Sequence, residues 1–258
     1  MAILRVVAAS RVRTVVLLLT TVVVAATCVR LGFWQLERLS QRRDFNAQVR
    51  MGLEASPTPV APLVDRVGDP DELSFRRVDA VGTYDIDHEV ILYGRPLDGR
   101  PGNHVLTPLV LDDGRAILVD RGWVPAEIDS TPITGEGEAP AGTVTVRGAL
   151  LRADDGEADD TDESPITTVR EVDVARLDRQ IPAELLPGVY LLLRSQEPAV
   201  DLPVPPELPE LTEGPHLGYA VQWFGFAVVA VIGYGLLARR DRRGPADANL
   251  ATDHDGEG

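Results

Sequence analysis

Two apolar segments, one near each end of the sequence, constrain this chain more than any other feature. Residues 217–238 are 22 consecutive residues without a charge. A helix of that length extends about 33 Å, which is enough to cross a hydrocarbon core of about 30 Å. A buried helix of a globular protein is rarely apolar on every face. With His216 at its start, the sequence therefore predicts a transmembrane helix over residues 216–238.

The N-terminal apolar segment is shorter and contains a charge. Residues 14–29 are 16 uncharged residues, and a helix continued through Trp34 extends about 31 Å. Arg30 then lies near the membrane boundary, where its long side chain reaches the headgroups, and the aromatic ring of Phe33 lies at the interface beside Trp34. We therefore predict a first transmembrane helix over 14–34. A cleaved signal peptide is the alternative.

Arginines flank both predicted helices on the side away from the middle of the chain. They are Arg5, Arg11 and Arg13 before the first helix and Arg239, Arg240, Arg242 and Arg243 after the second. Because basic flanks stay in the cytoplasm, residues 1–13 and 239–258 should be cytoplasmic and residues 35–215 extracytoplasmic. Arg38, Arg42 and Arg43 on the outer side weigh against this topology, whereas an even number of spans supports it. We expect a multi-pass protein of the cell membrane, embedded in the lipid bilayer.

The segment between the helices has the pattern of one β-rich domain. Residues 35–50 have a helical composition and should extend the first helix. Short apolar runs separated by Gly- and Pro-containing turns then indicate strands at 75–84, 89–93, 104–111, 115–119, 143–152 and 189–194. A turn at 112–114 joins two of them as a hairpin, and residues 172–181 have a helical pattern. We expect an α+β domain built as a small antiparallel barrel or sandwich.

Three polar segments complete the domain organisation. Residues 154–163 contain seven acids, and because the spacing of a calcium loop is absent, we interpret them as a solvated surface loop. Residues 201–215 contain five prolines and should form a semi-rigid tether into the second helix. The acidic tail 239–258 should be largely unstructured after residue 244.

Composition and charge exclude several function classes. The formal net charge is −15, which argues against binding of nucleic acid, because that needs a cationic surface. Cys28 is the only cysteine, so an internal disulfide and a cysteine-rich zinc site are excluded. His104 and Asp120 could together perform acid/base chemistry, but no serine or cysteine lies in a nucleophile motif. We therefore expect a protein that is not an enzyme.

His216 is the histidine that the sequence places at the mouth of a membrane helix. Tyr219, Ala220 and Trp223 follow at three, four and seven residues, and so share its helix face. An ionisable residue at membrane depth is a candidate functional site, and neutral imidazole is a common ligand of haem iron. The alternative is an interfacial histidine that is hydrogen-bonded to headgroups. These residues alone leave the two interpretations equal.

Four motifs occur together in a characteristic order. They are Gly32-Phe-Trp-Gln-Leu-Glu-Arg38, Phe75-Arg-Arg-Val-Asp-Ala-Val-Gly82-Thr-Tyr84, the pair Gly102-Asn-His104 and Asp120-Arg-Gly-Trp123, and His216-Leu-Gly-Tyr-Ala-Val-Gln-Trp223. In these motifs the chain resembles the Surfeit-locus cytochrome c oxidase assembly factors, over roughly residues 12–238. The resemblance implies two membrane helices around a large domain and a role in building haem-copper oxidases.

The resemblance also implies a ligand and partners. Bacterial members of the family are thought to bind haem a and pass it to the oxidase catalytic subunit, and haem a synthase is a second possible partner. The family's haem-linked histidine corresponds to His216. From the chemistry of the residues around it we expect Tyr219, Trp223, Phe33 and Trp34 to line the porphyrin. We expect Arg30 and Arg38 to pair with the propionates, because a guanidinium matches a carboxylate. Gly102 and Gly122 are expected to be structural. The alternative is a haem-free scaffold, or chaperone, for an oxidase subunit.

Overall fold

The computed structural model describes residues 2–154, 164–208 and 211–243. Most of the predicted acidic loop and the tail from residue 244 onward therefore lie outside the described residues. The chain divides into two compact units, one made of residues 1–46 with 211–258 and the other of residues 47–210.

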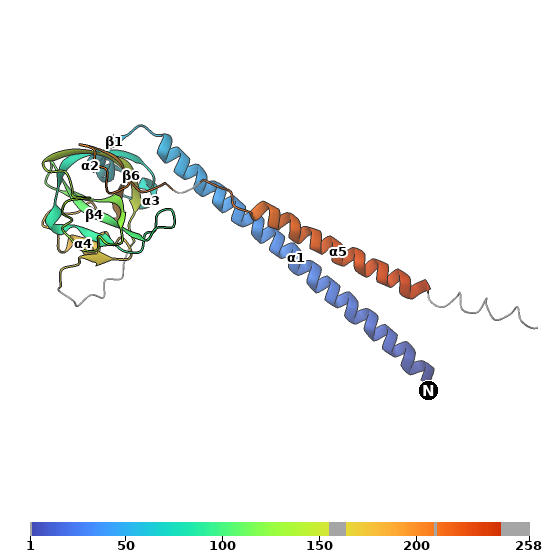
Figure 1. Cartoon of the computed structure of the whole chain (residues 1–258). Helices are drawn as coiled ribbons and strands as arrows, with labels where there is room; N and C mark the ends of the chain where they lie inside the picture. The colour runs from blue at the N-terminus through green and yellow to red at the C-terminus, as the bar shows by residue number, and fades with distance from the viewer. Residues whose placement is uncertain (1, 155–163, 209–210, 244–258) are drawn as a thin grey trace, which may run out of the picture. The chain divides into compact units, whose positions relative to one another are not determined.

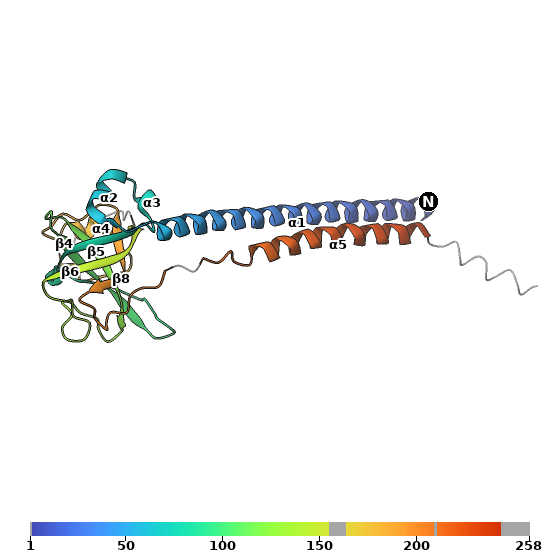
Figure 2. The ribbon, with the colours of Figure 1, turned by 90° about the horizontal axis from the view of Figure 1, so that it is seen from above.

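The first unit is a pair of long helices, as expected from the apolar segments. Helix α1 (Ala2–Glu54) runs without interruption from the first apolar segment through the expected extension, and helix α5 (His216–Arg243) contains the second. The two helices lie side by side in both views (Figures 1 and 2). By length and composition, Val12–Glu54 and His216–Arg240 can each cross a membrane.

The second unit is a β-barrel with short helices around it. Its strands are β1 (Thr58–Pro59), β2 (Arg77–Tyr84), β3 (Val90–Leu92), β4 (Gly102–Leu111), β5 (Ala116–Pro125), β6 (Thr143–Arg152), β7 (Thr168–Val169) and β8 (Val189–Glu197). They form one sheet in the order β1-β2-β6-β8-β5-β4-β3-β7, and an additional β2–β4 pairing closes it. Of the two architectures expected from the sequence, a barrel or a sandwich, the structure therefore has the barrel. It is not purely antiparallel, because β5 and β8 pair in parallel.

Two apolar cores cover the two faces of the central strands. Val78, Leu109 and Val146 belong to the core inside the barrel, whereas Leu106 and Leu118 belong to a second core, which packs against helix α4 (Val174–Asp178). Strands β4 and β5 are consequently buried on both faces, and their sequences do not alternate. Strand β2, with one face toward the core, does alternate between buried and exposed residues.

Short helices fill a segment that the sequence patterns leave without structure. After α1, the prolines predict only turns, but the chain forms α2 (Val60–Val67) and α3 (Pro70–Leu73), with η1 (Ile86–His88) after β2. Pro62 lies in the first turn of α2, where proline is tolerated because its missing N–H has no helical partner. Asp69 caps α3 by accepting a hydrogen bond from the Asp71 backbone N–H.

The chain that leaves the barrel is hydrogen-bonded to strand β5. Val204 and Trp123 exchange two backbone hydrogen bonds of 2.8 and 2.9 Å, so the first part of the proline-rich segment 201–215 is attached to the sheet. The close approach depends on Gly122, which has φ of 112° and on which a Cβ atom would overlap the Val204 carbonyl. The structural role expected for Gly122 therefore has a physical basis.

We predict that Gly122→Ala destabilises the barrel by about 2 kcal/mol or more, since it adds both backbone strain and overlap. The measurement is urea denaturation of the full chain in detergent, followed by the β-sheet circular dichroism signal. Gly114→Ala is the matched control, because Gly114 also has positive φ (85°) but no heavy atom within 4 Å of an added Cβ. Equal losses in the two variants would contradict the role of the Val204 contact.

Candidate functional site

The candidate site lies along the contact between α1 and α5, where small and polar residues replace large apolar ones. Most of the less exposed residues of α1 between 21 and 46 form a series with alternating steps of four and three, at positions 21, 25, 28, 32, 35, 39, 42 and 46, and residues 31, 36 and 45 flank this series. This heptad spacing keeps one face of a helix toward a partner helix. On α5, Ala220 and Ala227 are buried in the same contact. Small residues here let the two helices approach closely.

His216 lies in this contact and is hydrogen-bonded across it. Its Nδ1 atom is 2.9 Å from the side-chain carbonyl oxygen of Gln35, a residue 181 positions away in the chain. Because a carbonyl oxygen can only accept, Nδ1 carries the proton and donates it. The lone pair of the neutral ring is then on Nε2. A histidine that binds a metal through one ring nitrogen usually donates a hydrogen bond from the other nitrogen to a neighbouring acceptor.

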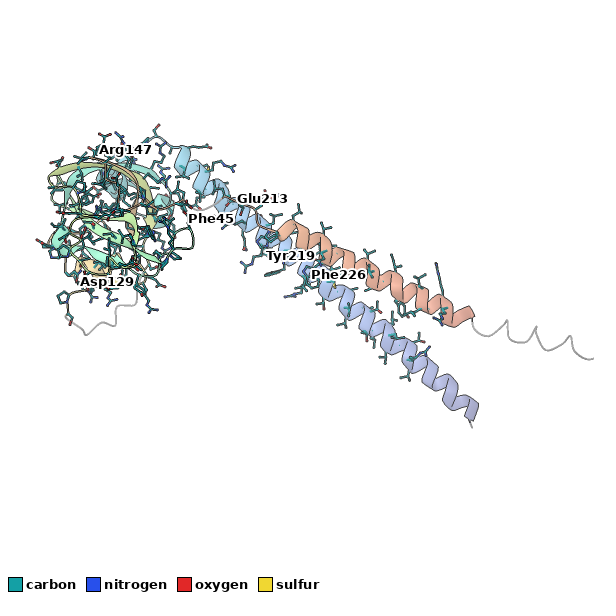
Figure 3. The ribbon with its side chains drawn as sticks, viewed as in Figure 1. Phe45, Asp129, Arg147, Glu213, Tyr219 and Phe226 are labelled. Atoms are coloured by element: carbon teal, nitrogen blue, oxygen red, sulfur yellow. The ribbon has the colours of Figure 1, made fainter. Side chains whose placement is uncertain are left out.

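Polar contacts tie the residues just before α5 to α1. The Thr212 carbonyl accepts hydrogen bonds from Arg42 Nε (3.2 Å) and Asn46 Nδ2 (3.1 Å). Glu213, labelled in Figure 3, forms a two-pronged ion pair with Arg43 at 2.8 and 2.9 Å. These hydrogen bonds lower the pKa of Glu213 and raise that of Arg43. The residues just before α5 are thereby attached to α1 about two to three helical turns after Gln35.

Aromatic side chains gather on both helices next to this point. Phe33 and Phe224 meet edge to face with ring centroids 5.4 Å apart. The Phe224 ring lies over Gly32, where a Cβ atom would come within 2.6 Å of it. Trp34 is 46% exposed, and Tyr219, labelled in Figure 3, is 49% exposed. An exposed aromatic surface of this kind is suited to lipid or to a flat apolar ligand.

A groove of about 460 Å³ opens on α1, and Arg30, Leu31, Phe33, Trp34 and Glu37 line it. Of the residues expected to bind haem, the groove therefore brings together Arg30, Phe33 and Trp34. Arg38 stacks over the Trp34 ring at 5.7 Å and donates a hydrogen bond to Gln41.

The remaining site residues are on α5 and are not among the groove's lining. Trp223 packs edge to face on Phe226 at 5.8 Å, and Tyr219 lies one turn after His216. Sequence reasoning missed Gln35 as the partner of His216. The available signal was a polar residue in the middle of the repeat of small residues on α1, a position that needs a hydrogen-bonding partner when it faces another helix.

A second cluster of ionisable residues is buried in the barrel. Glu89 and Arg121, both with fully buried side chains, form an ion pair of 3.1 Å. Glu89 also accepts hydrogen bonds from Thr107 and from the Ile133 backbone, while Arg121 donates to the Gly137 and Glu138 carbonyls. Burial lowers the pKa of Arg121, and the charge of Glu89 opposes that shift.

Asp120 and Arg121 are neighbours in strand β5, but their side chains do not pair with each other. Successive side chains of a strand point to opposite faces, and the Asp120 carboxylate instead lies 2.9 Å from His104 Nδ1. Asp120 also accepts a hydrogen bond from the Gly122 backbone. His88 pairs with Asp85 at 2.7 Å, and the described residues contain no group of three metal-ligating side chains.

The fold and these contacts define a class of protein. Its members combine, in one chain, a β-barrel domain and a pair of membrane-length helices that hold a hydrogen-bonded histidine between them. The SURF1 family model matches residues 22–228, and the chain belongs to the SURF1 family, which is known in general for oxidase assembly.

Individual relatives agree with the family assignment. A SURF1-like protein of Mycobacterium tuberculosis is 34% identical over 237 residues, which cover 88% of this chain and 84% of the relative. A SURF1-like protein of Rickettsia bellii is 26% identical over 230 residues, covering 86% and 90%. A SURF1-like protein of Dictyostelium discoideum is 33% identical over 100 residues, covering 36% and 37%.

Proposed function

We propose that this protein is a membrane-anchored assembly factor for haem-copper cytochrome c oxidase, which holds haem a and hands it to the catalytic subunit. Membership of the SURF1 family supports the assembly role. The length and apolar composition of α1 and α5 support anchoring by two membrane spans. The arginines that flank them support cytoplasmic termini and an extracytoplasmic barrel.

The observation that carries the haem proposal is the hydrogen bond between His216 and Gln35. Because this hydrogen bond holds the proton on Nδ1, the ring stays in the tautomer whose Nε2 lone pair is free to bind a metal. The residues present therefore fit a haem iron: His216 would hold it, and Phe33 and Trp34 would contact the ring plane. When bound, haem a supplies the redox centre that the oxidase needs, and this chain's own task is to hold and release it.

Two arginines would hold the acidic edge of the ligand. Arg30 and Arg38 lie two turns apart on α1, and a guanidinium pairs well with a propionate carboxylate. In this arrangement the protein contributes one bond to the iron, from the neutral imidazole, and apolar contacts to the ring. It contributes no redox chemistry of its own. We propose accordingly that the protein is a carrier without a catalytic residue, and that its partners are the oxidase catalytic subunit and haem a synthase.

The test is to purify the full chain after co-expression with haem a synthesis and to record its visible spectrum. We expect haem a to co-purify and to give the absorbance of a histidine-ligated haem, and deletion of the gene for this protein should lower the assembled oxidase. A colourless protein whose deletion still lowers oxidase assembly would favour the haem-free scaffold. Unchanged oxidase in the deletion strain would overturn the assembly role itself.

A further inference from the structure

An arginine-lined pocket lies on the outer face of the barrel, within the second unit. It has a volume of about 310 Å³, in the lower range of ligand pockets. Three arginines line it from three neighbouring strands: Arg77 from β2, Arg147 from β6 and Arg194 from β8. Such a concentration of positive charge is unexpected on a chain with a net charge of −15.

Strand pairing brings these side chains together. Asp79 pairs with Arg147 and Arg77 with Ala149 across β2 and β6, so that all four share one face of the sheet. Their neighbours Val78 and Val146 belong to the core inside the barrel, which places the arginines on the outside. Ala149 is only 1% exposed although it is on the outer face. A small residue therefore forms the floor of the pocket.

An irregularity of β8 adds the third arginine. The pairing of β6 with β8 shifts between Arg147, opposite Ser195, and Gly148, opposite Leu193. Arg194 is thus the extra residue of a β-bulge, a feature that redirects a side chain. Its guanidinium donates one hydrogen bond of 2.6 Å to the Pro206 carbonyl, a neutral acceptor that leaves the positive charge uncompensated.

The protein itself neutralises the charges of the three arginines only in part. Arg77 makes no ion pair or side-chain hydrogen bond with the part of the chain that the structure describes. Arg147 forms two loose ion pairs, of 3.6 Å with Asp79 and 3.8 Å with Glu197, both longer than hydrogen bonds. The pocket therefore has room for an oxyanion that accepts hydrogen bonds from several guanidiniums.

The carboxylate of Asp79 limits which anions the pocket can bind. Asp79 also lines the pocket. Its Oδ1 atom is shielded from solvent and faces Arg147 Nε at 3.6 Å, whereas its side chain is 40% exposed, so a ligand would reach this carboxylate through Oδ2. An anion that also carries an O–H group would satisfy it, whereas a fully ionised anion would be repelled. We propose that this pocket binds a phosphate group that keeps a P–OH, either as hydrogen phosphate or as the monoanion of a phosphomonoester, whose P–O⁻ oxygens pair with Arg77, Arg147 and Arg194 and whose P–OH donates to Asp79.

The experiment is calorimetric titration of the full chain in detergent with inorganic phosphate and with sulfate, at equal ionic strength. Because sulfate has no proton to donate near neutral pH, we expect phosphate to bind about tenfold more tightly. Arg147→Gln and Arg194→Gln should each weaken phosphate binding about tenfold. Asp79→Asn, whose amide can donate, should bring the two affinities close together. Arg66→Gln is the matched control, because Arg66 is exposed and outside the pocket.

Circular dichroism of each variant verifies its fold, and Arg77→Gln replaces any arginine variant that fails to fold. Titration with glycerol 3-phosphate and with vesicles containing phosphatidic acid distinguishes a soluble phosphomonoester from a lipid headgroup, and binding of either supports the proposal. The proposal is overturned if the wild-type chain does not bind phosphate at millimolar concentration. It is equally overturned if the arginine variants bind phosphate as tightly as Arg66→Gln, or if sulfate binds as tightly as phosphate to the wild-type chain.

Discussion

Replacement of His216 by alanine is expected to remove haem from the purified protein, with a loss of affinity of about 100-fold or more. The proposed site has one protein ligand to iron. Removing that ligand should cost more than the roughly 10–100-fold loss of affinity that follows when the hydrogen-bond partner of a ligand is changed. The measurement is haem content per chain, taken from the visible spectrum after co-expression with haem a synthesis. Addition of imidazole to the His216→Ala protein should restore part of the spectrum.

The matched control is His88→Ala, because His88 is paired with Asp85 in the other unit. Gln35→Leu provides an intermediate case, since it removes the acceptor of the His216 Nδ1 proton at 2.9 Å but leaves the ring in place. We expect about a 10–100-fold loss of haem affinity in that variant. Full haem content with an unchanged spectrum in His216→Ala would remove this histidine from the ligand role.

Glu89→Gln is expected to destabilise the barrel by about 3–5 kcal/mol, because it leaves the Arg121 guanidinium charged and unpaired in the interior. Both side chains are fully buried, and burial already lowers the pKa of Arg121. The measurement is the free energy of unfolding of the full chain in detergent, from urea denaturation. The double variant Glu89→Leu/Arg121→Met should lose less than the sum of the single losses, since it removes both charges together.

Asp71→Asn is the control for this prediction. Asp71 pairs with Arg152 at 2.8 Å, but both side chains are about half exposed, and an exposed pair contributes at most about 1 kcal/mol. If Glu89→Gln lowered the free energy of unfolding as little as Asp71→Asn, the prediction would be wrong. The hydrogen bonds around Arg121 would then be sufficient without the buried ion pair.

Local patterns in the sequence were sufficient for most elements of the barrel. Strand β6 was expected at 143–152, and the structure has it at Thr143–Arg152, because its side chains alternate between the core and solvent. Helix α2 was missed, since prolines conceal a helix whose first turn tolerates them. Strand β5 was expected to end at residue 119 and extends to Pro125, because burial on both faces removes the alternation that marks a strand's length.

Only part of the candidate site could be predicted from local sequence patterns. His216 is conspicuous in the sequence because it begins an apolar helix, but its partner Gln35 is 181 residues away. Glu89, just before β3, likewise meets Arg121 of β5, and the three arginines of the outer pocket come from three different strands. By itself the sequence determined the two apolar helices, the β-rich middle and the resemblance to an assembly factor family. Only the tertiary structure decided which polar groups meet, because strand register and helix contact depend on the whole fold, whereas periodicity depends on neighbouring residues alone.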